Sequence, residues 1–239
     1  MKAKNYDEES ARLKALKDYD VLDTPSEQAY DDITALAAFI CDVPIALISL
    51  VDADRQWFKS KVGLAVSETT RDVSFCAHAI LKQEVMVIPD TLLDQRFLDN
   101  PLVTCAPNIR FYAGVPLLTP SGYPLGTLCV IGHQPKVLSD AQCSTLAALA
   151  RQVVSQLELR RVSAQLANAL EQIEVMANLI PICAYCKDIR DDQGDWSTIE
   201  EFMAKHTEVE FTHSVCDRCM QEHFPAAAKL WSAKNNFLT

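Results

Sequence analysis

Residues 110–132 read RFYAGVPLLTPSGYPLGTLCVIG, two apolar runs on either side of a Pro-Ser-Gly tripeptide at 120–122. Apolar runs of this length that are rich in branched and aromatic residues favour β-strands, and a Pro-Ser-Gly segment favours a turn. The stretch therefore predicts two adjacent strands, 110–119 and 123–132. Residues 43–52 and 55–63 predict a second pair joined by a tight turn, and residues 86–90 predict one more strand.

Helical segments surround these strands. Residues 10–19 and 26–40 repeat apolar side chains near the helical period, and Ser26 is the expected N-cap of the second helix. From Ser139 onward the chain contains neither Gly nor Pro until Pro181, which predicts one long helix. Helices before and after a run of neighbouring strands predict an α+β fold around an antiparallel sheet.

The long helix has two kinds of apolar pattern. In its first half, side chains at the helical period predict packing against a globular core: Leu146, Leu149, Val153 and Leu157. In its second half, steps of three and four alternate as in a coiled-coil seam: Leu159, Val162, Leu166, Ala169, Ile173, Met176 and Ile180. We therefore expect a homodimer formed through this helix, and a helix folded back on its own chain is the alternative.

Composition limits the class of protein. The chain has 239 residues, 49% apolar and 23% charged, and no apolar run approaches the roughly 18 residues that cross a bilayer. Because the first residues lack the apolar stretch of a signal peptide, we expect a cytoplasmic protein without a membrane span. The formal net charge of −10 disfavours a long-range attraction to nucleic acid or anionic lipid.

Four of the nine cysteines form two Cys-x-x-Cys pairs, Cys183 with Cys186 and Cys216 with Cys219. Two such pairs supply the four sulfurs of a structural zinc site, which has no open position for catalysis. Iron, free thiols and two redox pairs are the alternatives. Residues 195–206, between the pairs, predict an amphipathic helix. Because this part of the chain is acidic overall, we expect it to bind a protein partner and no nucleic acid.

Several stretches within about residues 7–161 are informative together: YDVLDTP, PIALISLVDADRQWFKS, DVSFCAHAI, MVIPD, DQRFLDNPLVT, IRFYAGVPLLTPSGYPLGTLCVI and ALARQVVSQLELRR. They resemble the GAF domains at the N-termini of bacterial sensor histidine kinases and diguanylate cyclases. The resemblance implies a six-stranded antiparallel sheet flanked by helices, a small-molecule ligand and a signal passed along the exit helix. The C-terminal cysteine pairs resemble a small module at the ends of bacterial PAS, GAF and response-regulator proteins.

The resemblance also implies a ligand cavity between the sheet and the loops and short helices over one face. The lining residues that it assigns are Trp57, Phe58, Cys76, His78, Asp90, Phe97, Arg110 and Tyr112. A chromophore is not expected, because Cys and His are adjacent in bilin-binding relatives and one residue apart here.

Some of these residues have other roles open to them. Trp57 and Phe58 are neighbours on a strand, so only one faces inward. Asp90 could instead cap the turn that follows it, and Arg110 could form an ion pair with an acid such as Asp72. His78 could be a structural histidine that forms a hydrogen bond. Similar GAF domains carry Asp after Cys-Val-Ile, where this chain has Gly132.

No kinase, GGDEF-like or EAL-like signature is present, so we expect a signal-sensing protein that is not an enzyme. The alternative is a thiol-based enzyme or redox sensor related to free methionine-R-sulfoxide reductase, with Cys76 and Cys105 as the reactive thiols. Residues 129–131 and Tyr112 stand where that enzyme carries substrate-binding acids, which disfavours the reductase. A third reading is that the cysteines Cys41, Cys76, Cys129 and Cys143 are ordinary core side chains.

The predicted organisation is a GAF sensor domain at 1–158, a coiled-coil signalling helix at 159–180 and a four-Cys zinc module at 181–239. We expect the unidentified ligand to shift the helix between two arrangements, because a ligand favours the state that it binds better.

Overall fold

The computed structural model describes residues 2–177, 180–208 and 210–228, with the backbone alone for residues 173–177. The chain divides into two compact units, Met1–Ala169 and Leu170–Thr239. No helix among the described residues is both long and apolar enough to span a membrane.

The first unit contains one antiparallel sheet, in the strand order β3-β2-β1-β6-β5-β4. Its strands are β1 (Ile45–Val51), β2 (Arg55–Val62), β3 (Glu68–Thr70), β4 (Met86–Ile88), β5 (Phe111–Leu118) and β6 (Pro124–Gly132). This confirms the α+β prediction and the six strands implied by the resemblance. The pattern analysis missed β3, because three polar residues carry no alternation of apolar side chains.

The helices of this unit are α1 (Glu9–Asp18), α2 (Gln28–Cys41), α3 (Cys76–Ala79), α4 (Pro101–Thr104) and α5 (Asp140–Ala177), with short 3-10 turns η1 (Arg71–Val73) and η2 (Thr91–Leu93). The long helix α5 begins at Asp140, next to the predicted Ser139, and continues to Ala177; residues 178–179, over which the prediction extends the helix, lie outside the described residues. The prediction of Ser26 as N-cap is wrong. Helix α2 begins at Gln28 with Glu27 at the cap position, and the Glu27 carboxylate binds Lys59 and Arg160 instead of the helix backbone.

The hairpin between β5 and β6 forms as the opening stretch predicts. The amide of Thr119 donates to the Tyr123 carbonyl, and the amide of Gly122 donates to the Thr119 carbonyl. Gly122 has a φ of +86°, a conformation that glycine adopts without steric cost. The turn therefore fixes the register in which β5 pairs with β6.

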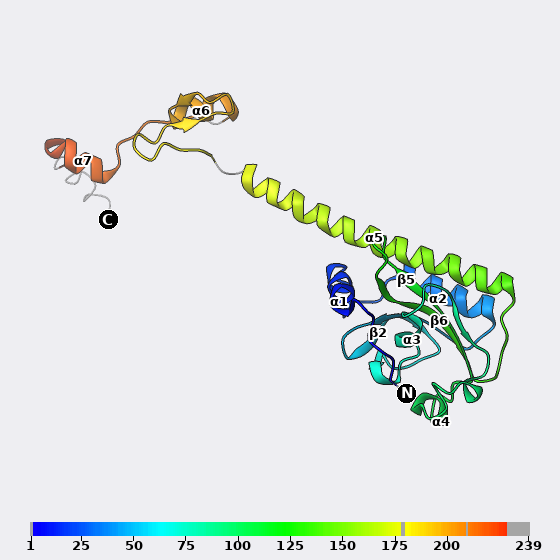
Figure 1. The fold of residues 1–239 in the computed structure, drawn as a ribbon. Helices are drawn as coiled ribbons and strands as arrows, with labels where there is room; N and C mark the ends of the chain where they lie inside the picture. The colour runs from blue at the N-terminus through cyan, green and yellow to red at the C-terminus, as the bar shows by residue number, and fades with distance from the viewer. Residues whose placement is uncertain (1, 178–179, 209, 229–239) are drawn as a thin grey trace, which may run out of the picture. The chain divides into compact units, whose positions relative to one another are not determined.

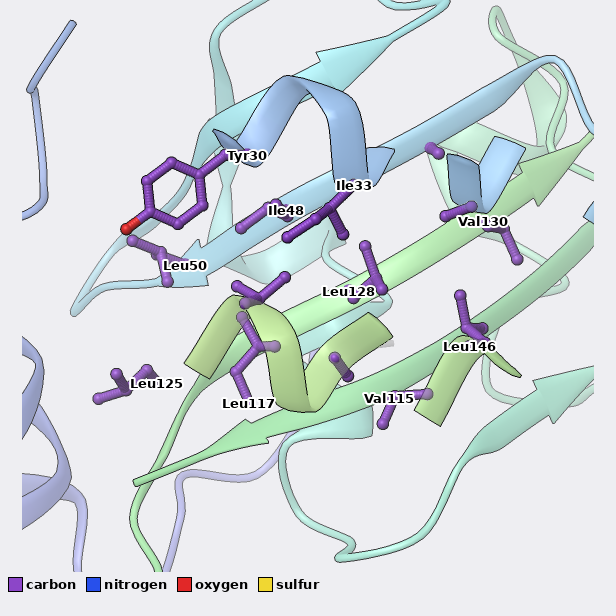
Figure 2. Packing of buried hydrophobic residues seen from close by; sticks show 14 of the residues in the cluster. Tyr30, Ile33, Ile48, Leu50, Val115, Leu117, Leu125, Leu128, Val130 and Leu146 are labelled. Atoms are coloured by element: carbon purple, nitrogen blue, oxygen red, sulfur yellow. The ribbon is translucent and has the colours of Figure 1, made fainter. Parts of the chain in front are cut away.

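Both faces of the sheet are buried. On one face, α2 and the first half of α5 cover the central strands (Figure 1), and Figure 2 shows Ile33 of α2 and Leu146 of α5 over Leu128 and Val130 of β6. The predicted core positions Leu146, Val153 and Leu157 are buried here, and Leu149 is partly buried. The opposite face packs against α3 and the segments around α4.

The second unit has little secondary structure. It contains a two-stranded sheet of β7 (Ile189–Arg190) and β8 (Trp196–Ser197), followed by α6 (Ile199–His206) and α7 (Asp217–His223). Thr198 and Glu201 form a capping box at the start of α6, so the helix predicted at 195–206 starts four residues later.

Candidate functional site

An apolar pocket of about 340 Å³ opens on the sheet face away from α2 and α5. Strands β1, β2 and β6 supply its floor, and residues 64–66 and 106–107 lie at its rim. The described residues that line it carry no charge: Ile45, Leu47, Gln56, Phe58, Leu64, Ala65, Val66, Thr69, Leu102, Ala106, Pro107, Ile109 and Ile131.

Two polar side chains reach this pocket. The Gln56 amide nitrogen donates to the Thr69 hydroxyl at 2.8 Å, and the Gln56 amide oxygen accepts from the hydroxyls of Ser49 and Ser74. The Ser74 hydroxyl in turn accepts from the amide of Ala77, in α3. This network connects the pocket wall to α3.

The structure places the eight predicted lining residues in several environments. Phe58 lines the pocket, whereas Trp57 packs in the core on the α2 side, so one of the two faces inward as expected. The Phe97 and Tyr112 rings are buried on either side of Phe75, with centroids 4.1 and 5.1 Å from the Phe75 ring. The His78 and Phe97 rings are in a T-shaped arrangement, with their centroids 4.9 Å apart. Phe97 and Tyr112 therefore pack against other rings and do not line the apolar pocket.

Asp90 and Arg110 make local contacts. The Asp90 carboxylate accepts from the Leu92 amide at 3.0 Å and caps η2, which matches the capping role considered for it. The suggested Arg110–Asp72 ion pair is wrong: Arg110 donates to the backbone carbonyls of Val103 and Ile109. Asp72 pairs with Lys2 at 2.9 Å.

Cys76 lies beside Cys129, with 3.8 Å between the two sulfurs, and both side chains are buried. Burial raises the pKa of Cys76, but the hydrogen bonds with Cys129 and Tyr112 and the nearby Thr127 hydroxyl outweigh it and lower the pKa to about 6. The hydrogen bond with Cys76, together with burial, raises the pKa of Cys129 well above its usual value. Cys105 is exposed and contacts the Thr104 hydroxyl. The thiol beside Cys76 is therefore Cys129, which sequence reasoning treated as a core residue.

A group of charged residues that sequence reasoning missed attaches α5 to the sheet. The Glu27 carboxylate accepts from Lys59 at 2.6 Å and from Arg160 at 2.8 Å. Lys59 is on β2 next to the pocket residue Phe58, and its side chain is fully buried. Strand β2 therefore connects the pocket to α5. Its residue Phe58 lines the pocket, and its next residue, Lys59, binds the same Glu27 carboxylate as Arg160 of α5.

The predicted seam of α5 is exposed where it is described. Leu159, Val162 and Leu166 are each more than half exposed, as is Ile180 beyond the helix. The side chains of Ile173 and Met176 lie outside the described residues.

The two cysteine pairs share one local geometry. Backbone amides of Cys186 and Tyr185 donate to the Cys183 sulfur and lower the pKa of that thiol. The amide and thiol of Cys219 do the same for Cys216. Among the described residues, no group of three or more His, Cys, Asp or Glu side chains is gathered closely enough to hold a metal ion. The two thiols within each pair are in contact, but the two pairs do not come together at one point.

A six-stranded antiparallel sheet with α2 and α5 over one face, and α3 and a small pocket on the other, defines a domain of the α+β class. The family model of the GAF domain matches residues 25–157, more than half of the chain. The chain therefore belongs to the GAF domain family.

One relative bears on activity. The chain is 40% identical over 156 residues to a cyclic di-GMP phosphodiesterase of Pseudomonas aeruginosa, an alignment that covers 65% of this chain and 27% of that protein. Because this relative is named as an enzyme, the finding overturns our prediction of a protein that is not an enzyme. That prediction rested on signatures missing from 239 residues, and this chain spans about a quarter of its relative.

Solved structures with a similar fold are more distant. The GAF domain of a phosphoenolpyruvate-protein phosphotransferase from Acinetobacter is 18% identical, with a TM-score of 0.47, and the match covers 65% of this chain and 98% of that one. Free methionine-R-sulfoxide reductase from Neisseria meningitidis is 17% identical, with a TM-score of 0.48, and the match covers 67% and 96%. At these values neither structure informs on what this chain binds or does.

Proposed function

We propose that this chain senses a small, uncharged and mainly apolar molecule through the pocket beneath β1, β2 and β6. The observation that carries the proposal is the lining itself, in which Gln56 and Thr69 are the polar side chains among the described residues. A pocket of about 340 Å³ is within the usual size range of small-molecule sites.

The same lining argues against a charged ligand. An ionic group that leaves water needs a charged or hydrogen-bonded partner, and burial without one is costly. Cyclic di-GMP carries two phosphates, and no Lys or Arg lines this pocket among the described residues. We therefore infer that the GAF ligand is distinct from cyclic di-GMP, although the relative's name favours cyclic di-GMP signalling as the setting in which this chain acts.

The ligand proposal is tested with N-phenyl-1-naphthylamine, an uncharged apolar fluorophore. We expect the full chain to bind it, and Ala65→Trp, which adds bulk at the exposed rim, to weaken binding at least tenfold. Leu93→Trp is the matched control, because Leu93 is exposed on η2 and does not line the pocket. Equal binding by the Ala65→Trp and Leu93→Trp variants, or displacement of the fluorophore by cyclic di-GMP, would contradict the proposal.

We further propose that the sensory unit works as a homodimer through the exposed seam of α5. Burying these leucines and valines between two copies would remove apolar surface from water, at about 25 cal/mol per Å². The Lys59–Glu27–Arg160 contact supports a role for α5 in transmission, because it ties the helix to a strand of the pocket.

The second unit is proposed to be a zinc-stabilised module that binds a protein partner. Four thiolates are a donor set that suits zinc, and amides directed at Cys183 and Cys216 favour the anionic sulfurs that metal binding requires. Two Cys-x-x-Cys loops converge when a cation compensates their charge. Tyr185, between Cys183 and Cys186, is almost fully exposed and is a candidate contact for the partner.

A further inference from the structure

Two buried thiols meet where α3 crosses the sheet. Cys76 is the first residue of α3, and Cys129 is in the central strand β6. Their sulfurs are 3.8 Å apart, and a disulfide requires about 2.05 Å. A local movement of α3 against β6 of roughly 2 Å would therefore close the bond.

The surroundings of the pair are polar although they are buried. The Tyr112 hydroxyl donates to the Cys76 sulfur at 3.5 Å. Gly114 makes room for it, because a Cβ at that position would lie 2.2 Å from the Tyr112 hydroxyl oxygen. The hydroxyl of Thr127 lies near both thiols and influences their pKa values, yet it is buried without a hydrogen-bond partner. A buried polar group left unpaired costs free energy, and an oxygen atom added to Cys76 would give this hydroxyl an acceptor.

We propose that Cys76 and Cys129 are a dithiol pair that hydrogen peroxide oxidises to a disulfide inside the GAF domain. This goes beyond ligand sensing, and it replaces Cys105 with Cys129 as the second thiol. The low pKa of Cys76 makes it the attacking sulfur, because the thiolate is the nucleophile.

The reaction has two steps. The Cys76 thiolate attacks one peroxide oxygen, so that an S–O bond forms, the O–O bond breaks, and the other oxygen leaves as water after taking up a proton. The Cys129 thiol then loses its proton and attacks the Cys76 sulfur, so that the S–S bond forms and the S–O bond breaks with release of a second water. Two thiols lose two electrons and two protons, and the peroxide is reduced to two waters.

The position of the Cys76–Cys129 pair determines both how peroxide reaches the thiols and what a disulfide would change. Helix α3 is a single turn whose Cys76, Ala77 and Ala79 side chains are buried in the core, so peroxide reaches the pair only through a local opening of this turn. Cys129 pairs in register with Leu47 of β1 and lies two residues before Ile131 on β6. Leu47 and Ile131 both line the apolar pocket, so a disulfide at this point would change the position of its floor.

The test is oxidation of the full chain with hydrogen peroxide, followed by denaturing alkylation with N-ethylmaleimide, proteolysis and mass spectrometry. We expect a cross-linked Cys76–Cys129 peptide, and a loss of two hydrogen masses that a reductant reverses. The Cys105→Ser variant should form the same cross-link, whereas Cys129→Ala should leave Cys76 as sulfenic or sulfinic acid.

The wild-type peptide map decides the question even where a variant fails to fold. A Cys76–Cys105 cross-link, or reduced Cys76 and Cys129 in a sample whose exposed Cys105 is fully oxidised, would overturn the proposal.

Discussion

The two units of this chain are stabilised by different means. In the GAF unit, both faces of the sheet are covered, and apolar side chains from α2, α5 and the strands form continuous cores. In the C-terminal unit, Ile189 is the one buried side chain among the described residues. A segment of this size with so thin a core needs a covalent or metal cross-link to fold. The comparison shows that apolar residues alone do not make a unit stable. They must also pack against one another and exclude water, as they do in the GAF unit.

Replacing a cysteine of the proposed zinc site should have the largest effect. We expect one zinc ion per chain in the wild-type protein and none in Cys216→Ser, with cleavage of the C-terminal unit by trypsin at least tenfold faster and the GAF unit intact. The reason is that metal binding is folding free energy for a module without a core. Atomic absorption and limited proteolysis measure both quantities. Cys105→Ser, an exposed cysteine outside the pairs, is the control. Unchanged protease resistance in Cys216→Ser would mean that metal does not stabilise this unit.

The seam of α5 gives the second prediction, since its side chains Leu159, Val162 and Leu166 are each more than half exposed. We expect Leu166→Glu to weaken homodimerisation at least tenfold, because it removes an apolar contact and places two like charges across the interface. Sedimentation equilibrium of the full chain measures the dissociation constant. Ala164→Glu adds the same charge at an exposed position on the helix face opposite the seam and should have little effect. A monomeric wild-type protein, or equal dissociation constants for the two variants, would argue against the coiled coil.

The smallest effect concerns a charged cluster that fastens α1 to the GAF unit. The Glu9 carboxylate accepts from Arg12 and from Arg71, each at 2.6 Å, and Arg12 also donates to the Val51 carbonyl. Burial raises the pKa of Glu9, but the hydrogen bonds from the two arginines outweigh it and bring the pKa to about 2. Because the folded pKa is below the ordinary value of 4.5, this stabilisation is present above pH 4.5 and is lost as the pH falls toward 2.

We therefore expect Glu9→Gln to lower the free energy of unfolding of the GAF unit by on the order of 1 to 3 kcal/mol at pH 7. Urea unfolding of the two proteins should show this difference shrinking between about pH 5 and pH 3. A difference that does not change with pH would mean that the carboxylate charge contributes nothing and that the loss is one of packing.

Local patterns predicted most of the elements and only part of the site. The hairpin at 110–132 and helix α5 follow from turn residues and the absence of Gly and Pro, which act over a few neighbouring residues. The opposite orientations of Trp57 and Phe58 follow from the two-residue period of a strand. The capping role considered for Asp90 is also local, because its carboxylate binds the amide of Leu92, two residues along the chain. The cap at Ser26 failed because Glu27 has long-range partners that no local pattern reveals.

The sequence by itself determined the family through its resemblance to GAF domains. It also determined the antiparallel sheet, the long exit helix and the two cysteine pairs, because these are specified by patterns and spacing along the chain. Only the tertiary structure decided that Cys129 lies beside Cys76, 53 residues away, and that Phe75, Phe97 and Tyr112 fill the space next to them. It also decided that the open pocket is apolar and that Ile131 and Phe58 are among its lining residues. The physical reason is that contacts across strands depend on register and on the packing of distant side chains, and neither is encoded in the period of a single element.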